Sequence, residues 1–163
     1  MSVLIIITGG TFDKEYDELR GRLYFNKTHV WEMLRLGRST APVRVKTLMM
    51  KDSLFMTTAD RRKVLAACRC ARETRIVVTH GTDTLADTAR LLGRELAASG
   101  KTVVLTGAMV PYAFGSSDGL FNLGAALAFA QCLPAGVWVA MHGTAFRHDG
   151  VRKDRRAGRF VRA

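Results

Sequence analysis

Threonine hydroxyls follow short apolar runs at two places in this chain, each time beside glycine. Thr11 closes the sequence Thr-Gly-Gly-Thr after a run of five apolar residues, and Thr82 follows a His-Gly pair after a second run. A third run leads into Thr106, again with a glycine next to it. A threonine hydroxyl becomes a nucleophile when a neighbouring group takes its proton, and the backbone amides of glycine turns can hold an oxyanion. The three segments predict one site that attacks a carbonyl carbon.

An acid, a base and two phenols accompany these hydroxyls. Asp83 directly follows Thr82, Lys153 lies in the basic C-terminal segment, and Tyr16 and Tyr24 lie in a charged stretch after the first threonine. A lysine with a lowered pKa, or a tyrosine, can accept a proton from a hydroxyl. Each residue also has a plainer interpretation, because Thr and Asp often cap turns and helices and basic runs are usually solvated. Only the combination predicts a hydrolytic site.

Cofactor and metal chemistry find little support in the sequence. The glycine patterns that bind dinucleotides and nucleoside phosphates are missing. His80 lies in a strand-end segment, where it fits a buried, hydrogen-bonded histidine better than a catalytic one. The four histidines and three cysteines show no metal-ligand spacing. We therefore expect neither a metal nor a cofactor.

The composition is that of one globular domain. The chain has 163 residues, of which 48% are hydrophobic and 24% charged, with a net charge of +11. Such a charge favours acidic partners, but the bases are scattered and not interleaved with aromatic residues, which argues against nucleic acid. No run approaches the roughly 20 apolar residues of a membrane span, and no signal peptide is visible. With three cysteines, an odd number, we expect a reducing, cytoplasmic setting.

The order of apolar segments predicts how these residues are brought together. Strands alternate with helices, which predicts an α/β three-layer sandwich with a mainly parallel sheet and its strand-end loops on one rim. The charged segment 12–25 is predicted to be a lid loop, with a plain solvated loop as the alternative. The basic tail 149–163 is predicted to be irregular. The expected strands are 3–8, 43–48, 75–79, 102–106 and 137–141, and the expected helices are 28–36, 57–71, 84–96 and 118–131.

Several of these segments match a known family. Thr-Gly-Gly-Thr at 8–11 and Thr-His-Gly-Thr-Asp-Thr at 79–84 resemble the two signatures of the bacterial-type L-asparaginase family. The segments 106–111 and 118–123 look like that family's next loop and helix, and Lys-Asp-Ser at 51–53 is similar to its substrate-carboxylate loop. The resemblance implies a flavodoxin- or Rossmann-like fold equivalent to the family's N-terminal domain. It also implies hydrolysis of L-asparagine to L-aspartate and ammonia.

The resemblance also implies a role for each site residue. Thr11 would be the nucleophile, and a lid tyrosine, Tyr16 in preference to Tyr24, would assist it. Thr82, Asp83 and Lys153 would form a second triad that activates water or the nucleophile. Ser53 and Asp83 would hold the α-carboxylate and α-amino groups of the substrate. The implied substrate-binding set is Gly10, Asp52, Ser53, Gly81 and Asp83.

Longer members of the family carry a second domain, and a partner subunit supplies an acid to the substrate. The present sequence ends ten residues after Lys153, so we expect one domain spanning 1–163, with the C-terminal domain absent, in a homo-oligomer (dimer or tetramer). Loss of the acid leaves the choice between asparagine and glutamine open, because one methylene changes binding only about 10- to 200-fold. Two alternatives remain: a weakly active or non-catalytic module that binds asparagine or aspartate, and a basic RNA-associated protein.

Overall fold

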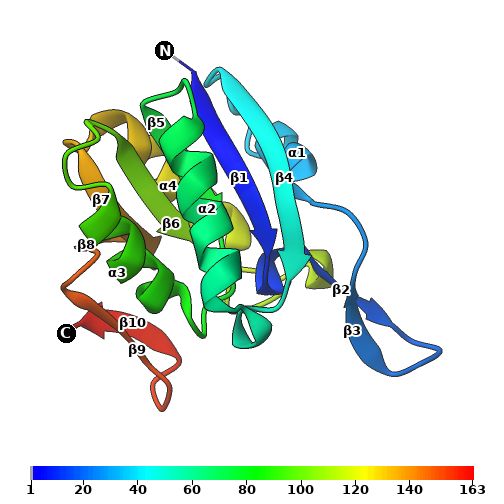
Figure 1. The fold of residues 1–163 in the computed structure, drawn as a ribbon. Helices are drawn as coiled ribbons and strands as arrows, with labels where there is room; N and C mark the ends of the chain where they lie inside the picture. The colour runs from blue at the N-terminus through cyan, green and yellow to red at the C-terminus, as the bar shows by residue number, and fades with distance from the viewer. Residues whose placement is uncertain (1) are drawn as a thin grey trace.

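The computed structural model describes residues 2–163, and a six-stranded sheet forms its centre (Figure 1). The strand order is β4-β1-β5-β6-β7-β8, and every neighbouring pair is parallel except β7 and β8. These strands are β1 (Val3–Gly9), β4 (Val43–Lys51), β5 (Arg75–Thr79), β6 (Thr102–Thr106), β7 (Gly136–Met141) and β8 (Thr144–Arg147).

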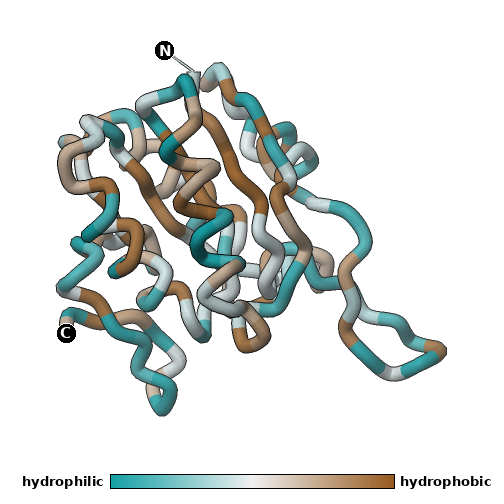
Figure 2. Tube along the Cα trace, in the orientation of Figure 1, coloured by the Kyte–Doolittle hydropathy of each residue, from teal (hydrophilic) through white to brown (hydrophobic). Residues whose placement is uncertain are grey.

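The central strands are apolar because helices cover both faces of the sheet. Every residue of β1 and β6 is buried, so the usual alternation of polar and apolar residues is missing. Figure 2 shows these strands as the most hydrophobic segments of the molecule. The predicted strands 75–79 and 102–106 are confirmed with the same bounds, whereas β4 runs on to Lys51.

Two helices lie on each face, as the sandwich prediction requires. Helices α1 (Val30–Leu36) and α4 (Gly119–Cys132) enclose one core, which includes Met33 and Leu123. Helices α2 (Thr58–Cys70) and α3 (Leu85–Glu95) enclose the other, which includes Leu65 and Leu92. Thr57 caps α2 in a reciprocal capping box with Asp60.

The segment 12–25 is not the loop that the sequence analysis predicts. After a 3₁₀ turn, η1 (Thr11–Asp13), the chain forms an antiparallel hairpin of β2 (Lys14–Asp17) and β3 (Arg22–Phe25). The Asp17 carboxylate accepts two backbone N–H groups of the turn, which shapes its tip. The hairpin projects away from the sandwich (Figure 1). Its strands carry no apolar pattern because most of their side chains are only partly buried or exposed.

The basic tail is also ordered, so the prediction of irregular structure is wrong. The strands β9 (Val151–Asp154) and β10 (Arg159–Arg162) form a second hairpin. One side chain from each strand, Val151 and Phe160, is buried in the core between the sheet and the α2–α3 layer. Strand β8 is a further element that the sequence analysis does not predict. Each of these strands has only four residues and contributes little to the core, which explains why no apolar pattern reveals them.

Candidate active site

The loops that follow β1, β4 and β5 touch one another at one edge of the sheet. A Cβ atom placed on Gly10 would lie 2.3 Å from the backbone nitrogen of Gly81. One placed on Gly81 would lie 2.5 Å from Ser53 Oγ. Contacts this close leave room for glycine only, and the φ angle of Gly10, 81°, is one that other residues rarely adopt. Thr11, Ser53 and Thr82 are therefore brought to the same rim, as expected of parallel strands.

Lys153 reaches this rim from the C-terminal hairpin. Its Nζ donates hydrogen bonds to Thr82 Oγ1 and to Asp83 Oδ1, each at 2.8 Å. Thr82 is only 5% exposed, and the Lys153 side chain is largely buried. The hydroxyl, the carboxylate and the amine of the predicted triad are thus in direct contact, although about 70 residues separate the lysine from the other two in sequence.

Thr11 stands at the first position of η1, directly after the turn at Gly10. It is partly exposed. Within residues 2–163 its hydroxyl makes no hydrogen bond, so the lone pairs of Oγ1 are not engaged by the protein. A hydroxyl in this position is free to turn toward a bound substrate.

The two candidate lid tyrosines lie on opposite faces of the β2–β3 hairpin. Tyr16 is paired with Leu23 and Tyr24 with Glu15, and successive residues of a strand point to opposite faces. The Tyr24 hydroxyl donates a 2.9 Å hydrogen bond to Glu15 Oε2, and this bond raises the pKa of Tyr24. Tyr16 is 53% exposed. Neither hydroxyl has a hydrogen bond to Thr11 in the described chain.

Ser53 and Asp52 differ in what their side chains contact. Ser53 is buried against Gly81, at 1% exposure. The Asp52 carboxylate forms an ion pair with Lys14 of β2 and accepts the N–H of Leu54. Partial burial acts to raise the pKa of Asp52, but these two hydrogen bonds outweigh it and leave the pKa lowered. Asp52 therefore links the base of the hairpin to the β4 loop.

His80 is a structural residue, as the sequence suggested. It is fully buried, and burial lowers its pKa to about 4. Its Nδ1 lies 2.8 Å from the carbonyl oxygen of Gly81, so Nδ1 carries the proton. Nε2 then accepts the Thr88 hydroxyl at 2.8 Å. These two bonds fix the turn that carries Thr82.

The side-chain amide of Asn122, which the sequence analysis does not identify, holds the segments next to the site in place through its hydrogen bonds. Asn122 donates to the Gly107 carbonyl and to Asp118 Oδ2, and it accepts the backbone N–H of His142. Asn122 is fully buried in a helix without charged residues, which is the only signal that could have revealed it.

Ser117 is the central residue of the segment Gly-Ser-Ser-Asp-Gly, which fits the G-x-S-x-G pattern around the nucleophile of many serine hydrolases. Its hydroxyl instead donates to the Val110 carbonyl and accepts the N–H of Gly119. Ser117 therefore fixes the loop before α4, and Thr11 remains the candidate nucleophile.

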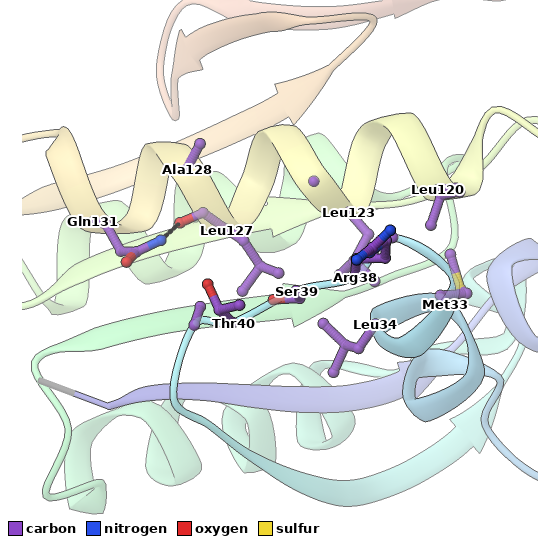
Figure 3. Close-up of a pocket in the computed structure, with 13 residues that line it drawn as sticks. Met33, Leu34, Arg38, Ser39, Thr40, Leu120, Leu123, Leu127, Ala128 and Gln131 are labelled. Carbon is purple, nitrogen blue, oxygen red and sulfur yellow. Dashed lines mark hydrogen bonds between the residues drawn. The ribbon is translucent and has the colours of Figure 1, made fainter.

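A separate cavity lies away from this site. It has a volume of about 540 Å³ and lies between α4 and the segment formed by α1 and the loop after it (Figure 3). None of the residues that line it belongs to the predicted site. Within residues 2–163, no cluster of three His, Cys, Asp or Glu side chains could hold a metal, and no helix is both long and apolar enough to span a membrane.

The chain is similar to known proteins over nearly its whole length. The family model "Asparaginase, N-terminal" matches residues 2–159. An L-asparaginase of Thermococcus kodakarensis is 31% identical over 143 residues, which cover 86% of this chain and 44% of the relative. A glutamyl-tRNA(Gln) amidotransferase subunit of Pyrococcus abyssi is 34% identical over 146 residues, which cover 86% of this chain and 33% of that relative.

The solved structure of the thermostable T. kodakarensis L-asparaginase superimposes with a TM-score of 0.85 and 28% identity. The match covers 99% of this chain and 51% of that structure. The chain therefore spans about a third to a half of the length of these relatives. Together with the family model, which covers nearly the whole chain, this shows that the protein belongs to the asparaginase family.

Proposed function

We propose that this protein is an L-asparaginase, which hydrolyses the side-chain amide of L-asparagine to L-aspartate and ammonia. The observation that supports this most strongly is the contact of Lys153 Nζ with both Thr82 Oγ1 and Asp83 Oδ1 on the rim that also presents Thr11. The family relationship favours the same reaction. No step of the proposed reaction uses a metal or cofactor.

The proposed reaction has two steps, with Thr11 as the nucleophile. Its oxygen attacks the amide carbon while its proton is passed on to the leaving nitrogen, so ammonia departs and an aspartyl ester remains on Thr11. A water molecule then hydrolyses the ester, which releases aspartate and returns the proton to Thr11. Backbone N–H groups of the turns at Gly10 and Gly81 are the proposed donors to the oxyanion that forms in each step.

Lys153 and Thr82 are the proposed base system. A neutral Lys153 Nζ can accept a proton from Thr82, and Asp83 fixes the direction of the amine. Thr82 would then take a proton from water or from Thr11; the two routes share the same three residues. The partial burial of these groups strengthens their interactions compared with those in water.

Tyr16 is the proposed lid residue, acting on Thr11 after the hairpin moves toward the rim. The Tyr24 hydroxyl is engaged by Glu15, which disfavours its deprotonation and makes it the weaker candidate. In this structure Tyr16 lies beside the hairpin turn, because a Cβ atom on Gly21 would be 3.9 Å from its hydroxyl. Substrate binding would therefore have to be accompanied by hairpin closure.

Substrate recognition is proposed to involve the α-carboxylate and α-amino groups. Ser53 would bind the carboxylate, Asp83 would bind the ammonium group, and the turns at Gly10 and Gly81 would supply the oxyanion donors described above. Asp52 would act mainly by holding the β4 loop, because Lys14 already neutralises it. We further propose a homo-oligomer, dimer or tetramer, in the cytoplasm. A mass measurement in solution that finds only fully active monomer would exclude the assembly.

The test is ammonia release by the purified protein, with L-asparagine and L-glutamine measured side by side. The proposal expects turnover of asparagine, and the rate with glutamine measures the preference that the sequence leaves open. Calorimetry that detects asparagine binding without ammonia release would favour a non-catalytic binding module instead. Retention on RNA that falls steeply with salt, together with no response to either amino acid, would favour the RNA-associated alternative.

A further inference from the structure

The hairpin that carries Lys153 has few attachments to the rest of the molecule. On β9, the Val151 carbonyl accepts a 2.9 Å hydrogen bond from Arg90 of α3, and Lys153 itself contacts the rim. On β10, the Phe160 ring is buried in the core, and the Phe160 N–H donates a 3.1 Å hydrogen bond to Nε2 of His142. Within residues 2–163, the imidazole is therefore the polar attachment that joins β10 to the segment following β7.

Phe160 and Lys153 are directly opposite each other in the hairpin. Because Phe160 gives its N–H to His142, it does not give it to Lys153, so the two form a non-hydrogen-bonded pair. Side chains of such pairs lie on one face and are close together. A movement of β10 at Phe160 is thus passed directly to the lysine.

His142 is itself held in a defined position. It follows β7, has a φ angle of 56°, which is rare for a side chain other than glycine, and donates its backbone N–H to Asn122 Oδ1. The structure thus provides a continuous chain of contacts from the buried Asn122 amide through His142 and Phe160 to Lys153. A strained backbone that aims one ring nitrogen at a single N–H indicates a specific requirement.

We propose that His142 is a positioning residue that keeps Lys153 on Thr82 and Asp83, and that protonation of His142 releases the hairpin and switches hydrolysis off in acid. Nε2 accepts a hydrogen bond, so the neutral ring carries its proton on Nδ1. A protonated ring has two donors and no acceptor, and its Nε2–H would meet the Phe160 N–H head on. This inference rests on the proposed function of Lys153.

The groups around His142 leave the hydrogen bond from the Phe160 N–H as the contact that changes when the ring is protonated. His142 is exposed to solvent. The groups that face it are the Asn122 amide from α4 and the backbone and ring of Phe160 from β10, whose centroid lies 6.0 Å from that of the imidazole. Within residues 2–163 no carboxylate forms an ion pair with His142. The charged groups in the same series of contacts are Lys153, Asp83 and Asp118.

Two substitutions of His142 distinguish the effect of its hydrogen-bond acceptor, Nε2, from the effect of its left-handed backbone conformation. His142→Gln places an amide oxygen near the position of Nε2 and does not titrate. His142→Asn suits the left-handed backbone but is too short to reach Phe160. His148→Gln, at the other end of β8, is the matched control, because within residues 2–163 His148 makes no hydrogen bond to β10. All three and the unmodified protein are assayed for ammonia release from pH 5 to 9.

We expect the kcat of the unmodified protein and of His148→Gln to fall on acidification. His142→Gln should keep its alkaline kcat to distinctly lower pH. His142→Asn should lose about fivefold in kcat at pH 8, the equivalent of one net hydrogen bond, with a smaller change in KM. Identical acid limbs in the unmodified protein and His142→Gln would overturn the inference.

A second readout does not depend on turnover. The protection factor of the Phe160 amide, which is its hydrogen-exchange rate corrected for the intrinsic dependence on pH, should fall on acidification in the unmodified protein, and the ¹³Cε resonance of Lys153 should shift over the same pH range. Neither change should occur over that range in His142→Gln. Both are measured by NMR. Both responses in a chain that releases no ammonia would support the positioning role and reject the proposed function. Active protein whose Phe160 exchange is the same in His142→Asn as in the unmodified chain would reject the positioning role alone.

Discussion

At the scale of single residues, the contact between Lys153 and Thr82 decides what the site can do. A hydroxyl at 5% exposure, bonded to an amine and next to a carboxylate, is a poised proton acceptor only when the amine is neutral. As an ammonium group, Lys153 can only donate. The proposed reaction therefore requires a lysine that can lose its proton, a role that arginine cannot take.

Lys153→Met keeps the length of the side chain and removes the amine. We expect kcat for ammonia release to fall about 100-fold or more, the usual contribution of general base catalysis. Lys153→Arg retains the positive charge and the donors, and we expect a loss of the same order. The measurement is steady-state ammonia release with L-asparagine. Nearly full activity of Lys153→Arg would show that Lys153 does not act as a base.

A substitution at Gly10 tests whether the loops after β1 and β5 must be in contact. Gly10→Ala would push a methyl group into the Gly81 backbone, at 2.3 Å from its nitrogen. We expect a loss of more than ~2 kcal/mol in the free energy of unfolding, together with lost activity. Gly100→Ala is the control, because Gly100 has a similar φ of 67° but no atom within 4 Å of the added methyl. Equal denaturation midpoints for the two variants would contradict the proposed loop contact.

At the scale of elements, the β2–β3 hairpin separates its two tyrosines onto opposite faces, so one closing movement can bring only one of them to Thr11. We expect Tyr16→Phe to lower kcat about 100-fold, within the usual range for a group that moves a proton. Tyr24→Phe loses one exposed hydrogen bond to Glu15 and should stay within a few fold of the unmodified protein. Kinetics of both variants under identical conditions check this. The reverse ranking would assign the lid role to Tyr24.

The elements differ in how much of them the sequence reveals. Strands such as β5 and β6 are buried on both faces, so their apolar runs predict both existence and bounds. The two hairpins carry little or no apolar pattern, since β9 and β10 are anchored mainly by Val151 and Phe160. The structure, and not the sequence pattern, therefore reveals these two hairpins.

The same contrast holds for the candidate site. Thr11 and Thr82 can be placed together from the sequence because both follow buried parallel strands. The chain's own pattern gives no reason to bring Lys153 to them, and only the family resemblance does. Asn122 and His142 act through contacts between distant segments, which no local pattern shows.

At the scale of the whole molecule, the buried His80 makes stability depend on pH. Burial lowers its pKa to about 4 in the folded state, against an unperturbed value near 6.5. The unfolded chain then binds a proton more readily. The contribution of His80 to the free energy of unfolding is fully present above about pH 6.5. It falls as the pH drops toward 4, by ~3 kcal/mol at most.

Chemical denaturation between pH 4 and 8 measures this effect. The unmodified protein should show a rise in unfolding free energy with pH over the range from about 4 to 6.5. His80→Gln should show a flatter dependence, because glutamine does not titrate. His148→Gln should retain the slope. A slope that is unchanged in His80→Gln would assign the pH dependence to other groups.

The most direct test of the hydrolase account concerns Thr11. Thr11→Ala should fold like the unmodified protein by circular dichroism and release ammonia from L-asparagine at least ~1000-fold more slowly, on the order of the losses seen when a nucleophile is removed. Thr11→Ser, which keeps a hydroxyl, should recover part of the rate. If Thr11→Ala releases ammonia at a rate close to that of the unmodified protein, then Thr11 is not the nucleophile and the proposed reaction is wrong.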